Sequence, residues 1–101
     1  MKVHWTATAE RHLDRIHDYI ALDSTLYARR TIARIIRRSQ QIAEFPLSGR
    51  KVPEYDRENV REIIEGQYRI IYLLNSGQID VLLLSMELCK SRLVMNYDSY
   101  L

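Results

Sequence analysis

The chain has 101 residues, of which 47% are hydrophobic and 28% are charged, and its formal net charge is +2. This composition is ordinary for a soluble globular protein, and the length predicts one domain, residues 1–101, whose core needs neither disulfides nor metal. No apolar run approaches the ~20 residues of a membrane span, and the small net charge does not identify a partner.

Two features of the sequence bear on the cellular compartment. Cys89 is the single cysteine, so the chain cannot form an internal disulfide, which favours a reducing compartment. Residues 1–8 include a lysine and a histidine among scattered apolar groups, which is unlike a signal peptide. Together these features predict a cytoplasmic protein.

The N-terminal segment predicts a strand followed by an amphipathic helix. Val3 and Trp5 alternate with polar residues, as expected for an edge strand over residues 2–5. Thr6 is suited to cap the helix, because its side-chain oxygen can accept a hydrogen bond from a backbone N–H of the first turn. The apolar face of this helix has spacings of four, three and four, through Ala9, Leu13, Ile16 and Ile20.

A second amphipathic helix is predicted from about Leu26 to Glu44, after a break and a cap at Asp23-Ser24. Its apolar stripe is predicted to contain Ala28, Ile32, Ile35, Ser39 and Ile42, widened by Ile36 and Ala43. Two such helices joined by a tight turn form an αα-hairpin, whose apolar stripes need a sheet to cover. Phe45-Pro46 ends the second helix, because proline disfavours helical backbone at the residue before it. Residues 47–50 then predict a turn, and residues 51–59 predict an extended, charged loop.

The rest of the chain predicts three strands. Residues 60–74 form a β-hairpin, and residues 79–85 are so apolar that they predict a central, well covered strand. Residues 86–101 are expected to form a divergent tail or a short helix, since Leu93 and Tyr97 have helical spacing. The order β-α-α-β-β-β predicts an α+β fold, with an antiparallel αα-hairpin packed on a small, mainly antiparallel sheet.

The register of the hairpin follows from its turn. Gly66 occupies the first central position of a two-residue type II′ turn, where φ must be positive. The predicted pairs are Glu65 with Tyr68, Ile63 with Ile70, and Arg61 with Tyr72. Arg61 then lies on one face, and Glu62 and Arg69 lie on the other, each among apolar side chains. Since an arginine within a sheet must be paired or reach solvent, the hairpin is the first place to look for function.

The second helix is rich in arginine and has no acidic residue before Glu44. Its arginines are Arg29, Arg30, Arg34, Arg37 and Arg38. Three of them are spaced four apart, where like charges repel by a few tenths of a kcal/mol per pair. The sequence leaves two explanations open: a solvated helix face, or a surface for an anionic partner such as an acidic peptide or a nucleic acid.

Few residues form a pattern that is typical of catalysis. The three histidines lack the spacing of a metal site, no Ser/His/Asp group or phosphate-binding glycine loop stands out, and no cofactor is expected. Arg61, Arg69 and Glu54 could cleave a phosphodiester, with the arginines stabilising the transition state and the carboxylate acting as base. The alternative is a diagonal ion pair between Arg69 and Glu62 that only holds the hairpin together.

Several segments of the chain, in this order, resemble one known family. They are Trp5-Thr6 with Ala9, Leu13, Ile16 and Tyr19-Ile20, then Phe45-Pro46-Leu47-Ser48-Gly49-Arg50, Val52-Pro53-Glu54, Arg61-Glu62-Ile63 and, most specifically, Gly66-Gln67-Tyr68-Arg69-Ile70-Ile71-Tyr72. In these segments the chain resembles the RelE/ParE toxins of bacterial type II toxin–antitoxin modules. The resemblance extends from Trp5 to Leu84.

This resemblance implies a toxin that is kept inactive by an antitoxin encoded beside it. RelE-like members cut messenger RNA in the ribosome, whereas ParE-like members poison DNA gyrase. Arg69 matches the arginine shared by the RNA-cleaving members, and Glu54 stands where some of them have an active-site glutamate. However, Val60 and Glu62 stand where RelE has lysines, and residues 85–89 lack the His-Arg that ends the fourth strand in many relatives. These departures favour the ParE-like mode.

The resulting hypothesis is a ParE-like toxin that inhibits DNA gyrase by binding rather than by catalysis. The surface expected to bind the antitoxin comprises Arg30, Arg34, Arg37 and Arg38. One alternative is a ribosome-dependent endoribonuclease that uses Arg69, Arg61 and Glu54. A second alternative is a non-toxic basic binding module.

Overall fold

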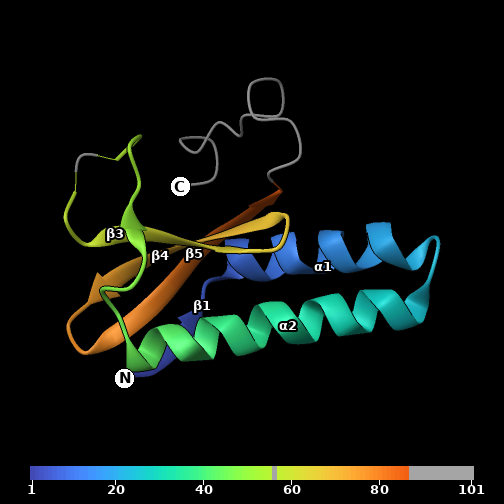
Figure 1. Cartoon of the computed structure of the whole chain (residues 1–101), viewed down its shortest axis with the longest axis horizontal. Coiled ribbons are helices and arrows are strands. Elements are labelled where there is room, and N and C mark those ends of the chain that lie inside the picture. Colours follow the sequence, from blue (N-terminus) through green and yellow to red (C-terminus); the bar gives the residue numbers. More distant parts are fainter. Residues whose placement is uncertain (56, 87–101) are drawn as a thin grey trace.

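The computed structural model describes residues 1–55 and 57–86. The elements in this part of the chain are β1 (Lys2–Trp5), α1 (Ala7–Ala21), α2 (Thr25–Glu44), β2 (Arg50–Lys51), β3 (Val60–Glu65), β4 (Tyr68–Asn75) and β5 (Gln78–Met86). The strands form one sheet in the order β1-β5-β4-β3-β2, in which β1 is parallel to β5 and the other pairs are antiparallel. Both helices lie on the same face of this sheet (Figure 1). The predicted α+β architecture is confirmed.

The strand β2 was not expected from the sequence. Arg50 was assigned to a turn and Lys51 to a loop, but they pair with Glu62 and Arg61 of β3 at the edge of the sheet. A strand of two exposed, charged residues has no alternation of apolar and polar side chains, so the usual strand signal is missing. The central position predicted for residues 79–85 is correct, because β5 lies between β1 and β4 and is mostly buried.

The helix caps follow the prediction. The side chain of Thr6 accepts a hydrogen bond from the amide of Ala9 at the start of α1, and Ser24 accepts one from the amide of Tyr27 at the start of α2. The Thr6 hydroxyl also donates to the carbonyl oxygen of Val81 at 2.8 Å. This bond fixes the start of α1 to β5 next to an irregularity in the β4–β5 pairing.

The buried stripe of α2 differs from the predicted one in one position and in its width. It comprises Ala28, Thr31, Ile35, Ser39 and Ile42. Thr31 is buried while Ile32 is only half-buried, and Ile36 is exposed rather than part of the stripe. Hydrophobicity alone predicted Ile32 and Ile36, but the line of contact with the sheet decides which residues are buried.

The hairpin register is as predicted. Ile63 pairs with Ile70, and Glu65 pairs with Tyr68 across a two-residue turn in which Gly66 has a φ of +62°. Alternation along the strands divides their side chains between two apolar clusters. The larger cluster lies under the helices and includes Tyr72, whereas the smaller one, on the face turned away from the helices, comprises Val52, Val60, Ile71 and Leu83.

Neither helix in the described part of the chain combines the length and the apolar character needed to cross a membrane. The strand β5 extends to Met86, so this residue does not belong to the predicted tail. The short helix or tail predicted further on, and Cys89, lie outside the described residues.

Candidate functional site

A buried carboxylate lies on the sheet face turned away from the helices. The Glu62 side chain is completely buried, and it is held between two arginines from the neighbouring strands. Arg69 of β4 donates from Nε to Glu62 Oε1 at 2.8 Å and also donates from Nη2 to the same oxygen. Arg50 of β2 donates from Nε to Glu62 Oε2. The ion pair between Arg69 and Glu62, one of the two explanations left open by the sequence, is therefore present.

Glu54 adds a second carboxylate to this cluster. Its Oε1 lies 4.0 Å from Nη2 of Arg69, and its side chain is 44% exposed, whereas that of Arg69 is 11% exposed. The cluster of Arg50, Glu54, Glu62 and Arg69 thus contains two positive and two negative groups. We refer to it as the β-face charge cluster.

Arg61 is not part of this cluster. It is the neighbour of Glu62 in β3, so its side chain is on the helix-covered face, where Nη1 donates to the carbonyl oxygen of Gly49 at 2.9 Å. The structure therefore brings together Arg69 and Glu54, two of the three residues proposed for phosphodiester cleavage, and separates the third. Arg61 instead helps to hold the segment between α2 and β2.

The arginines of α2 are in two different environments. Arg29, Arg30, Arg34 and Arg37 are exposed. Arg38 is half-buried, with Nε 3.8 Å from Glu65 Oε1 and Nη1 donating to Gln41 at 3.1 Å. The sequence showed no acidic residue near Arg38 on its own helix, but the hairpin brings the carboxylate of Glu65, which is distant in the sequence, to its side.

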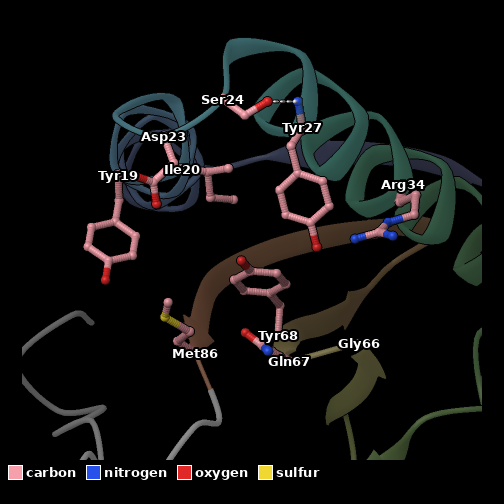
Figure 2. A pocket seen from close by; sticks show the side chains of 10 residues that line it. All are labelled: Tyr19, Ile20, Asp23, Ser24, Tyr27, Arg34, Gly66, Gln67, Tyr68 and Met86. Atoms are coloured by element: carbon pink, nitrogen blue, oxygen red, sulfur yellow. Dashed lines mark hydrogen bonds between the residues drawn. The ribbon is translucent and has the colours of Figure 1, made fainter.

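A cleft of about 610 Å³ opens between the connection of the two helices and the tip of the β3–β4 hairpin. Figure 2 shows the rings of Tyr27 and Tyr68 close to one another, with the Arg34 guanidinium beside Tyr27 and Met86 at the end of β5. The remaining residues that line the cleft are Tyr19, Ile20, Asp23, Ser24, Gly66 and Gln67. Arg34 also lines a smaller hollow with Arg37, Arg38, Gln41 and Glu65, so the cleft lies next to the arginines of α2.

The tyrosines of the cleft differ in exposure. Tyr68 is buried, and this burial raises the pKa of its hydroxyl. Tyr19 and Tyr27 are 66% and 54% exposed, and their gathering at one cleft was missed by the sequence interpretation. The available signal was the position of these two tyrosines on either side of the predicted break at Asp23-Ser24.

The side chain of His12 joins α1 to β5. Its Nδ1 accepts a hydrogen bond from the backbone amide of Leu84 in β5 at 3.1 Å. Burial, and to a smaller extent Arg15 and Arg11, lower the pKa of His12, which favours the neutral ring that this bond requires. Within the part of the chain that the structure describes, no three His, Cys, Asp or Glu side chains are arranged to hold a metal ion.

Comparisons with known proteins give consistent results. A family described as the ParE toxin of the type II toxin–antitoxin system parDE matches residues 3–85. A chromosomal ParDE toxin–antitoxin system from P. aeruginosa has a chain with 21% identity and a TM-score of 0.71, and the match covers 85% of this chain and 95% of the other. The RelBE2 toxin–antitoxin complex from Mycobacterium tuberculosis has a chain with 20% identity and a TM-score of 0.63, with 84% and 95% covered. No curated protein sequence matches.

Proposed function

Because the chain belongs to the ParE toxin family of type II toxin–antitoxin systems, we propose that it arrests growth by binding and poisoning DNA gyrase. We also propose that a cognate antitoxin keeps it inactive. The protein would then act by occupying its target, without a catalytic step of its own. The β-face charge cluster is the observation that supports this mode most directly.

A ribonuclease of this fold needs cationic groups that can hold a phosphate and stabilise the charge that develops in the transition state. Of the two arginines considered for phosphodiester cleavage, Arg69 is the one that lies near the candidate base, Glu54. Its Nε and Nη2 are bound to the buried carboxylate of Glu62. Glu54 adds another negative charge 4.0 Å away. A phosphate approaching Arg69 would meet two carboxylates, and Arg61 is on the opposite face. This arrangement favours binding over phosphodiester cleavage.

One observation supports the alternative of messenger RNA cleavage. Glu54 is 44% exposed and lies close to Arg69, as a general base beside an electrophilic arginine would. For this alternative to operate, Arg69 would have to exchange Glu62 for the phosphate.

The experiment that tests the proposal is a direct comparison of the two targets. We expect the purified protein to inhibit supercoiling by purified gyrase and to produce no new 5′ ends in messages in a translating extract. Codon-specific cleavage with unaffected supercoiling would establish the alternative instead. If expression of the chain does not arrest growth at all, the result favours the second alternative, a non-toxic basic binding module.

The antitoxin is proposed to bind as an acidic segment along α2. Arg30, Arg34 and Arg37 are exposed on this helix, and arginine can make bidentate contacts with carboxylates. Exposed ion pairs are each worth only ~0–1 kcal/mol, so apolar or aromatic anchors must supply most of the affinity. The cleft beside Arg34, with Tyr27 on its wall, is a suitable place for one such anchor.

The contribution of these arginines is measurable as an association rate. We expect Arg30→Gln/Arg34→Gln/Arg37→Gln to bind the antitoxin more slowly than the wild type and with a weaker dependence on salt, because charges across an interface act mainly by steering the encounter. Arg11→Gln/Arg57→Gln is a control with exposed arginines outside α2. Equal rates and equal salt dependence for the triple variant and the wild type would leave α2 as a solvated face.

A further inference from the structure

Four arginines of α2 form a surface whose charge is not compensated. We name Arg29, Arg30, Arg34 and Arg37 the arginine face. Among the described residues, no carboxylate lies within 4.0 Å of any of these four guanidinium groups. By contrast, Arg38, next in sequence to Arg37, is near Glu65.

The spacing of the arginine face suits an extended anion rather than a single small one. Arg30, Arg34 and Arg37 are at positions i, i+4 and i+7, so they follow one side of the helix. At a rise of 1.5 Å per residue, Arg30 and Arg37 are about 10 Å apart along the axis. Duplex DNA carries roughly one negative charge per 1.7 Å of its own axis, so a stretch of that length presents several phosphates to these side chains.

The cleft and the hollow beside the arginine face add to this match. Arg34 reaches the cleft whose wall includes Tyr27, and Arg34 and Arg37 line the neighbouring hollow together with Arg38, Gln41 and Glu65. Neutral hydrogen-bonding groups such as the Tyr hydroxyl and the Gln amide contact phosphate oxygens in protein–DNA complexes, as arginines do. Of the residues of α2, only Glu44 at its last position is acidic, and Glu65, whose carboxylate lines the hollow, lies beside Arg38 rather than within 4.0 Å of the four arginines.

We propose that the arginine face contacts the phosphate backbone of duplex DNA, specifically the DNA segment that gyrase holds. The identity of this DNA rests on the proposed function, whereas the affinity for a phosphate backbone does not. Contact with both the enzyme and its DNA would let the toxin hold the two together. An acidic antitoxin on the same arginines would exclude DNA, and this competition would be one cause of neutralisation.

The test measures binding of the full-length protein to a fluorescein-labelled 24-base-pair duplex by anisotropy, over a series of salt concentrations. Binding through phosphates makes log K fall linearly with log salt, with a slope of about −0.9 per phosphate contact. We therefore expect the slope for Arg34→Gln/Arg37→Gln to be smaller in magnitude by about 2 than the slope for the wild type. Arg11→Gln/Arg57→Gln removes the same charge elsewhere and should keep the wild-type slope.

Thermal melting establishes that each variant is folded before its slope is compared. Two changes of sequence in the duplex should leave the affinity unaltered, because backbone contacts do not read bases. The inference is overturned if the two double variants have the same slope, or if the protein binds polyglutamate but not the duplex. Supercoiling inhibition by the wild type is measured separately, so a failure of the gyrase proposal is distinguishable from a failure of DNA binding.

Discussion

Glu62→Ala is expected to lower the free energy of unfolding by about 3 kcal/mol, at the lower end of the range for breaking a buried ion pair. The Glu62 side chain is fully buried, and its loss removes the hydrogen bonds and the ion pair that it makes with the guanidinium of Arg69, which is 11% exposed. The carboxylate of Glu54 lies further from this guanidinium, at 4.0 Å. Arg50 is 68% exposed and can turn to water, so it adds little to the loss. The total free energy of unfolding of a small domain is ~5–15 kcal/mol, so a loss of this size should be evident in a urea titration.

The matched control is Glu58→Ala. Glu58 also pairs with a cation from β2, Lys51, but both side chains are well exposed, so the unfolding midpoint should not change measurably. A double-mutant cycle between Glu62→Ala and Arg69→Ala should show coupling, since the two side chains are in contact. If Glu62→Ala unfolds at the same urea concentration as the wild type, the carboxylate does not support the fold and our account of the cluster is wrong.

The same cluster separates a structural role of Arg69 from a role in toxicity. Replacing a buried pair by apolar residues of similar size is often neutral or stabilising, so Glu62→Leu/Arg69→Leu should be more stable than Glu62→Ala. If the protein acts by binding gyrase through other surfaces, this folded double variant should still arrest growth. A folded variant that has lost toxicity would instead show that Arg69 contacts the target.

The sequence was sufficient to predict the hairpin because its register depends on local chemistry. Gly66 fixes a two-residue turn. This turn determines every residue pair between β3 and β4, and therefore also the diagonal neighbours Glu62 and Arg69. The helix caps Thr6 and Ser24 are local in the same sense. Each of these features is set by residues within one turn or at one helix end.

The features that were missed depend on contacts between distant segments. Arg50 meets Glu62, and Arg38 meets Glu65, only after β2 and α2 have been placed against the hairpin. The cleft forms where Tyr27 of α2 meets Tyr68 of β4, and neither helical periodicity nor strand alternation brings these two residues together. The partners of a charged side chain, and therefore its availability for function, cannot be read from spacing along the chain.

Gly49→Ala is expected to destabilise the protein by about 1–3 kcal/mol or more, for a reason that is also tertiary. A Cβ at this position would lie 2.5 Å from the Tyr72 hydroxyl oxygen and 2.6 Å from the carbonyl oxygen of Glu62. The Tyr72 ring is completely buried and the second atom belongs to the backbone of β3, so neither can move aside easily. Gly49 is thus required by close packing, whereas Gly66 is required by its positive φ.

The clash would also break the hydrogen bonds that hold the segment between α2 and β2. The Tyr72 hydroxyl donates to the carbonyl oxygen of Pro46 at 2.8 Å and accepts from the amide of Gly49 at 3.1 Å. Ser48→Ala changes the neighbouring, exposed residue without adding atoms near Tyr72, and it should unfold like the wild type. Urea denaturation of the two variants gives the comparison. If Gly49→Ala is as stable as Ser48→Ala, the segment can shift to accommodate a methyl group, and the buried tyrosine does not fix its position.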